Sequence, residues 1–166
     1  MLPLVLLAGC GSADPAAAPN DAPAYFTQVA DLTAELDAEN TAADAELHDT
    51  LAGTPDDAVG DLFAQVTEEG AARHEAMIDE LELLTPPDEV ADAHAALVTT
   101  SRAIAAQDRI VAGELAGLTA DELGERETST DYLKAEADVD GACATLQGLA
   151  DDAGAEVDLC VGLYAS

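Results

Sequence analysis

A chain of 166 residues is long enough for one domain with a hydrophobic core, and a hydrophobic fraction of 49% can supply that core. Its charge is extreme, because 35 Asp and Glu residues face only 5 Lys and Arg residues, which gives a formal net charge of −30 at pH 7. A field of this sign repels phosphate backbones and anionic lipid headgroups, so we expect neither a nucleic-acid partner nor attachment to a membrane through a basic patch. The small partners that this charge favours are cations, and the acidity is also typical of proteins from saline habitats.

The most specific motif lies near the start of the chain. A short apolar run leads into Leu7-Ala8-Gly9-Cys10, and a polar stretch broken by prolines follows. This arrangement resembles the lipobox of a bacterial or archaeal lipoprotein. The resemblance implies cleavage before Cys10, a lipid such as palmitate on the Cys10 thiol, and a domain held at the cell membrane on its extracytoplasmic side. Residues 1–9 are then a truncated lipoprotein signal peptide, since no basic segment precedes the apolar run, and residues 10–21 are the lipidated cysteine and a flexible linker.

Residues 22–166 are expected to form an acidic helical-bundle domain. Apolar residues recur there at spacings of three and four, which is typical of amphipathic helices. The pattern predicts a first helix over about 24–51, a second over 55–84 and a third over 87–115, joined by short connections that make neighbours pack antiparallel. A polar stretch at 124–130 interrupts the fourth helix. We therefore expect an all-α, up-down-up-down bundle of about four helices with the fourth broken or kinked.

Individual residues mark the ends of these helices. Thr54 is expected to cap the second helix, and Gly53 to end the first in the left-handed conformation. Thr119-Ala120-Asp121-Glu122 has the capping-box pattern, and Ser129 or Thr130 can restart the chain as a helix. An apolar tail over 157–164 should fold back on the bundle. Two positions interrupt the apolar stripes: Asn40 on the first helix and Gly70 on the second.

Two of the three cysteines are left to pair if Cys10 carries a lipid. A disulfide between Cys143 and Cys160 suits an extracytoplasmic compartment and closes a loop of roughly 17 residues, which stabilises the fold by about 3 kcal/mol in the chain-entropy model. The alternative is a redox or metal-binding thiol pair. No Cys-x-x-Cys spacing or nearby histidine supports that alternative.

The histidines offer a possible metal site. Measured along ideal helices, His74 lies about 28 Å and His94 about 35 Å above the lower end of the bundle, so the two are expected to be level neighbours. A carboxylate from the first helix, Glu35 or Asp31, could complete a site, whereas His48 lies at the other end. The competing interpretation is that these are ordinary surface or boundary histidines, which we favour because nothing fixes a ligand geometry.

Motifs of several enzyme classes are missing from the sequence. Alanine occupies the position three residues before each histidine, so the Glu-x-x-His motif of ferritin-like di-iron proteins is absent. There is also no P-loop, GxGxxG, GxSxG or EF-hand pattern. We expect a lipid-anchored protein that is not an enzyme, requires no cofactor, and acts through binding an unknown protein partner or through a structural role in the envelope. The alternative is a metal-binding lipoprotein that uses His74, His94 and a first-helix carboxylate, and a hydrolytic enzyme is a remote third hypothesis.

Overall fold

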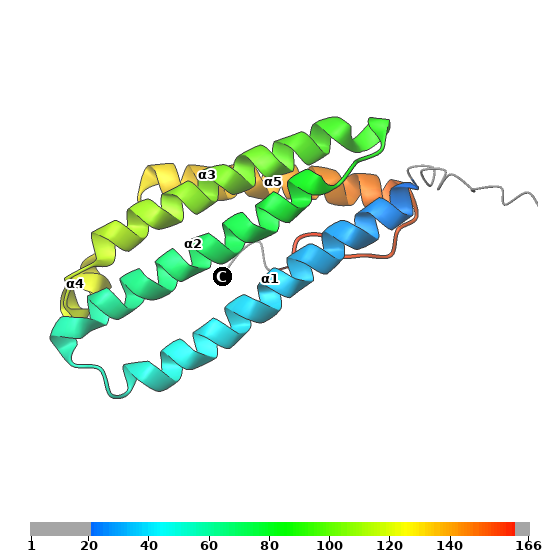
Figure 1. The fold of residues 1–166 in the computed structure, drawn as a ribbon. Helices are drawn as coiled ribbons and strands as arrows, with labels where there is room; N and C mark the ends of the chain where they lie inside the picture. Colours follow the sequence, from blue (N-terminus) through cyan, green and yellow to red (C-terminus); the bar gives the residue numbers. More distant parts are fainter. Residues whose placement is uncertain (1–20, 162–166) are drawn as a thin grey trace, which may run out of the picture.

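The structure, a computed structural model, describes residues 21–161 of the chain. Every regular element within this range is a helix, as the sequence predicts. Four long helices run beside one another with alternating direction (Figure 1), and α1 packs on α2, α2 on α3 and α3 on α5. The elements are α1 (Ala22–Leu51), the 3₁₀ turn η1 (Asp56–Ala58), α2 (Val59–Leu83), the 3₁₀ turn η2 (Asp88–Val90), α3 (Ala91–Leu115), α4 (Ala120–Glu125) and α5 (Thr130–Asp152). The predicted break in the fourth helix is confirmed, because α4 and α5 are separate.

The predicted helix ends are partly right. The side chain of Thr119 accepts a hydrogen bond from the N–H of Glu122 and forms the expected capping box, and Ser129 caps α5 by accepting from the N–H of Tyr132. Thr54, in contrast, does not cap α2. Its hydroxyl donates to the carbonyl oxygen of Thr50 at 2.9 Å, and a 3₁₀ turn precedes α2. Gly53 does not adopt the left-handed conformation either. Helix α1 ends instead in a short turn, in which the N–H of Gly53 donates to the carbonyl oxygen of Thr50.

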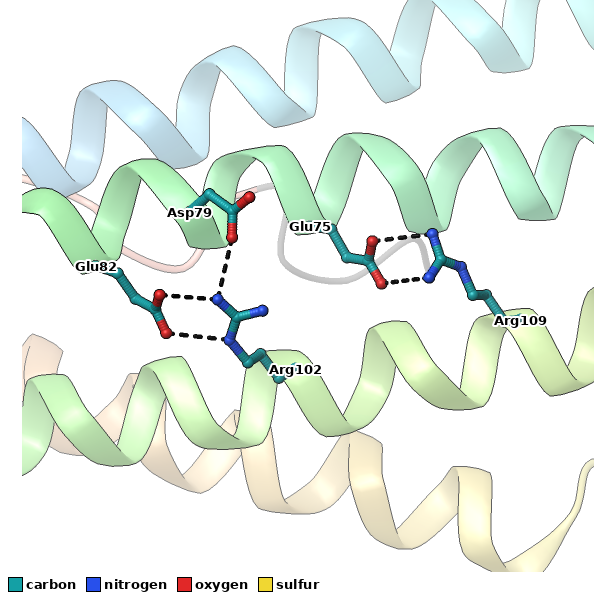
Figure 2. A network of polar contacts seen from close by, with 5 residues as sticks. All are labelled: Glu75, Asp79, Glu82, Arg102 and Arg109. Carbon is teal, nitrogen blue, oxygen red and sulfur yellow. Dashed lines mark hydrogen bonds and ion pairs between the residues drawn. The ribbon is translucent and has the colours of Figure 1, made fainter.

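Arginine side chains on α3 bridge to carboxylates on α2 (Figure 2). Arg102 contacts Asp79 at 3.0 Å and Glu82 at 2.8 Å, and Arg109 contacts Glu75 at 2.7 Å. All of these groups are at least partly exposed to solvent, so each pair contributes little to stability. These ion pairs instead define how α2 and α3 lie against each other, because each guanidinium on α3 contacts carboxylates on α2 that lie at its own height in the bundle.

The segment after α5 is held to the bundle by several contacts. Gly154, with φ of 72°, ends α5 in a Schellman turn in which the Ala155 N–H donates to the carbonyl of Ala150 at 2.9 Å. Leu159 is fully buried, and the side-chain amide of Gln147 accepts from its N–H at 2.9 Å. The predicted folding back of the tail is therefore seen as far as residue 161, and the rest of that prediction lies outside the described residues.

The hydrophobic core lies mainly at the end of the bundle where α1 begins and α5 ends. All the buried residues of α1 lie between Tyr25 and Leu36, although the apolar stripe of the sequence continues to Leu51. The reason is the short fourth helix. Tyr132, at the start of α5, contacts Asp108, and α3 continues from there for seven residues, or about 10 Å, with no partner in α5. The second half of α1 therefore packs on α2 and faces a hollow where a longer fourth helix would lie.

Candidate functional site

The disulfide that the sequence suggests is present. Cys143 on α5 and Cys160 in the following segment are joined by a sulfur–sulfur bond, with their Cα atoms 5.9 Å apart. Cys143 is buried, so the link ties the segment that carries Leu159 to the core. Cys10, the predicted lipidation site, lies outside the described residues. Within the described part, no helix is long and apolar enough to cross a membrane.

The predicted metal ligands do not lie together. The Tyr25 hydroxyl and Nδ1 of His94 share a hydrogen bond of 2.8 Å, whereas Arg73, next to His74, donates to Asn40 at 3.1 Å. Tyr25 and Asn40 are fifteen residues apart on α1, so the two histidines differ in level by about 20 Å. Glu35 lines a separate hollow between α1 and α2. Residues 21–161 contain no group of three His, Cys, Asp or Glu side chains that could hold a metal ion.

The sequence predicts that His74 and His94 are level neighbours, and this prediction is wrong because the connection between α2 and α3 is extended. Leu84 and Pro87 have extended ψ angles of 146° and 151°. The consecutive prolines at 86 and 87 disfavour the helical conformation of the residue that each of them follows. The segment from Leu84 to Pro87 carries the chain past the end of α2 before α3 begins. His94, in the first turn of α3, therefore lies beyond the end of α2, while His74 lies well below it.

A cavity of about 310 Å³ lies in the hollow below the core. It is bounded by the second half of α1 and by α2, α3 and the start of α5. Its apolar lining includes Leu47, Phe63, Val66 and Ile104, and its polar lining includes Asn40, Asp44, Arg73, His74, Asp108, Tyr132 and Glu136. Polar side chains from all four long helices therefore meet in one place.

His74 is the most unusual residue of this lining. Its side chain is 7% exposed, and its Nε2 atom is buried without a hydrogen-bond partner among the described residues. Burial lowers its pKa to about 4, and the nearby carboxylate of Glu75 only partly opposes this effect. The imidazole is therefore neutral at neutral pH and has an unused hydrogen-bonding atom.

Asp108 and Tyr132 form the wall opposite to α1. Burial raises the pKa of the Asp108 carboxyl, and hydrogen bonding to Tyr132 acts in the opposite direction. Burial raises the pKa of the Tyr132 hydroxyl to about 12, with further contributions from the charges of Asp108 and Glu136. Tyr132 thus keeps its proton and remains a hydrogen-bond donor beside the two carboxyl groups.

Arg73 is held in the wall between this cavity and the hollow that contains Glu35. Its Nε donates to Oδ1 of Asn40 at 3.1 Å. The other four basic residues, Arg102, Arg109, Arg126 and Lys134, all form ion pairs, whereas Arg73 has no ion pair within the described part of the chain. The cavity therefore holds three carboxyl groups, one guanidinium and one neutral imidazole.

The sequence alone singled out only part of this lining. The apolar stripes point to Asn40 and Gly70 as interruptions, and the histidine pattern points to His74 as a candidate ligand, with a different partner. Neither pattern points to Asp108 or Tyr132. The available signal was the position of Asp108 on the apolar stripe of α3, four residues after Ile104, where a carboxylate needs a partner or a cavity.

These residues could hold a polar organic ligand, since the cavity combines acceptors, a tyrosine donor and an apolar region. Comparison of the chain with protein-family models, with curated proteins and with solved structures finds no match, so the site stands on its geometry alone.

Proposed function

We propose that this protein is a lipid-anchored, extracytoplasmic binding protein, not an enzyme, and that it takes up a small organic molecule in the cavity beside His74. Lipidation at Cys10 would hold the helical domain at the membrane surface. The linker over residues 10–21 would then set its distance from the bilayer, with a span of about 20 Å if it behaves as a random coil.

The observation that carries the binding role is a cavity of about 310 Å³ lined by His74, whose buried Nε2 atom has no hydrogen-bond partner among the described residues. A buried polar atom without a partner costs about 1–3 kcal/mol, so proteins rarely keep one without a use. A ligand that supplies the missing hydrogen bond would recover part of this free energy. The cavity volume is at the lower end of the range for small-molecule sites.

Binding can be tested by nuclear magnetic resonance on the domain over residues 21–166. A set of small molecules of mixed charge would be added while the ring resonances of His74, Tyr132 and Phe63 are followed. Saturable shifts at these three residues, with Tyr25 and Phe26 unchanged, support the proposal. Tyr25 and Phe26 are suitable controls because they lie in the core at the other end of α1. If no compound shifts the cavity residues, the proposed binding role is wrong.

Anchoring needs a separate experiment. The full chain would be expressed in a bacterium behind a complete lipoprotein leader and grown with radiolabelled palmitate. Label should enter the wild-type protein and the Cys143→Ala/Cys160→Ala variant, and Cys10→Ala should abolish it. Label that persists in Cys10→Ala, or a wild-type protein that stays unlabelled, would overturn the anchoring proposal.

A further inference from the structure

We infer that the cavity selects organic cations, namely an ammonium group joined to an apolar or aromatic group. This inference rests on the proposed function and adds the chemical class of the ligand. It follows from three properties of the lining, which are its charge, its excess of hydrogen-bond acceptors and its apolar floor.

The charge of the lining is negative. Asp44, Asp108 and Glu136 bring carboxyl groups from three different helices, and Arg73 is the only cationic residue among the described residues of the lining. The Nε of Arg73 donates to Asn40 within the same lining, and the residue also borders the hollow lined by glutamates between α1 and α2. The net charge of −30 raises the concentration of cations around the whole molecule. An anionic ligand would meet opposition from both the site and the surrounding field.

The hydrogen-bonding groups point to the same class. An ammonium group has donors and no acceptor. The cavity offers the carboxyl oxygens of Asp44, Asp108 and Glu136 as acceptors, and the imidazole of His74 also belongs to its lining. A ligand carboxylate could accept from Arg73 or Tyr132, but it would then lie beside the carboxyl groups of Asp108 and Glu136.

The apolar floor separates an organic cation from a metal ion. Phe63, Leu47 and Val66 belong to the apolar lining, which we call the floor of the cavity, and Tyr132 lines the cavity as well. Two of the five Phe and Tyr residues in the chain therefore lie at this site. Aromatic faces attract organic cations through their quadrupoles and provide apolar contact for the rest of the ligand. A bare cation would gain nothing from this floor, and the described residues contain no three-ligand group for a metal.

The test compares four compounds that share a phenyl group and differ in charge. Phenethylamine is the cation, phenylalanine the zwitterion, phenylpropionate the anion and phenethyl alcohol the neutral member. We expect phenethylamine to shift the resonances of His74, Tyr132 and Phe63 with at least tenfold higher affinity than the other three. Added sodium chloride should weaken its binding, because screening reduces the attraction to the carboxylates.

Variants then identify the groups involved. Glu136→Gln should weaken phenethylamine binding about tenfold, because one charge-assisted hydrogen bond is lost. Phe63→Leu should weaken it less, since apolar contact remains. Asp140→Asn is the matched control, because Asp140 is an exposed acid one turn further along α5 that does not line the cavity. It should leave the affinity unchanged, and circular dichroism would confirm that all three variants fold.

The outcomes distinguish this inference from the proposed function. If phenylalanine, phenylpropionate or phenethyl alcohol binds as tightly as phenethylamine, the site binds small molecules but the inference of cation selectivity is wrong. Equal weakening by Asp140→Asn and Glu136→Gln would also overturn it, since the effect would then come from the general field. Zinc or magnesium chloride that shifts the same resonances and displaces phenethylamine would reassign the site to a metal. If none of the four compounds binds, the inference of cation selectivity fails. The proposed binding function is then tested by the set of small molecules of mixed charge described above.

Discussion

The backbone N–H of Gly60, in the first turn of α2, donates to the carbonyl oxygen of Leu118 at 3.0 Å. The first N–H groups of a helix have no partner within it, so this contact uses one of them to hold the loop that follows α3. The backbones approach so closely that a Cβ atom at position 60 would lie 2.5 Å from the carbonyl oxygen of Leu115. Glycine is therefore required for the docking of this loop on α2.

Gly60→Ala should destabilise the protein by about 1–3 kcal/mol, because the added methyl group forces two backbones apart. The measurement is the free energy of unfolding from urea titration followed by circular dichroism. Gly141→Ala is the matched control, since Gly141 lies within α5 and a Cβ there meets no atom within 4 Å. That substitution should stabilise the protein by about 0.5–1 kcal/mol through helix propensity alone. Similar effects of the two substitutions would show that the close contact at Gly60 is absent.

The disulfide between Cys143 and Cys160 predicts a loss of stability on reduction. With a sequence separation of 17, its removal should cost about 3 kcal/mol in the chain-entropy model. The Cys143→Ala/Cys160→Ala variant should unfold at lower urea concentration and be insensitive to reductant, while the wild-type protein should shift toward it when reductant is added. Thiol labelling of the unfolded, unreduced domain provides the check. Free reactivity of both cysteines would contradict the pairing.

The fold was largely predictable because its signals are local. The apolar spacing, the prolines at 55 and 87 and the capping box at Thr119 act within a few residues, and they place the helices within a turn of their observed bounds. The level of His94 was not predictable from ideal helices. It depends on how far the extended segment from Leu84 to Pro87 carries the chain, which is a three-dimensional property of one short connection.

The site was less predictable than the fold for a related reason. The cavity forms because α5 is too short to pack opposite the second half of α1. Continuous apolar stripes, such as the one that includes Leu47 and Leu51, indicate that a face can be buried but not that a partner is available. Asn40 and Asp108 gave a partial signal as polar residues on apolar faces. That Asn40 and Asp108 lie at the same height in the bundle depends on how α1 and α3 are shifted along each other, which the sequence does not show.

The hydrogen bond between Tyr25 and His94 offers a test of the core around the start of α1. Tyr25→Phe removes the hydrogen-bond partner of Nδ1 of a buried ring, and we expect a loss of about 1–3 kcal/mol. Packing should survive, because the ring at position 25 still meets Phe26 edge-to-face at a centroid distance of 5.3 Å. The free energies of unfolding of Tyr25→Phe, His94→Leu and the double variant together give the coupling energy between the two residues. If the two single effects simply add, the residues do not interact and the hydrogen bond is wrong.

The buried imidazole of His74 predicts a specific dependence of stability on pH. Its pKa is lowered from 6.5 in the unfolded chain to about 4 in the folded protein. Between these two values the unfolded chain binds a proton that the folded protein does not, so acidification favours unfolding, and stability rises again as pH increases toward 6.5. The full effect is about 3 kcal/mol for a shift of this size.

His74→Met isolates this contribution, because methionine fills similar space and does not titrate. The many carboxylates act in the opposite direction, since acid relieves their mutual repulsion, but they do so in both proteins. Urea unfolding at a series of pH values from 4 to 7 gives the difference in free energy between wild type and variant. We expect wild type to lose about 3 kcal/mol relative to His74→Met over this range. A difference that stays constant with pH would show that His74 titrates in the folded protein as it does in the unfolded chain, and would remove the support for a neutral imidazole in the wall of the cavity.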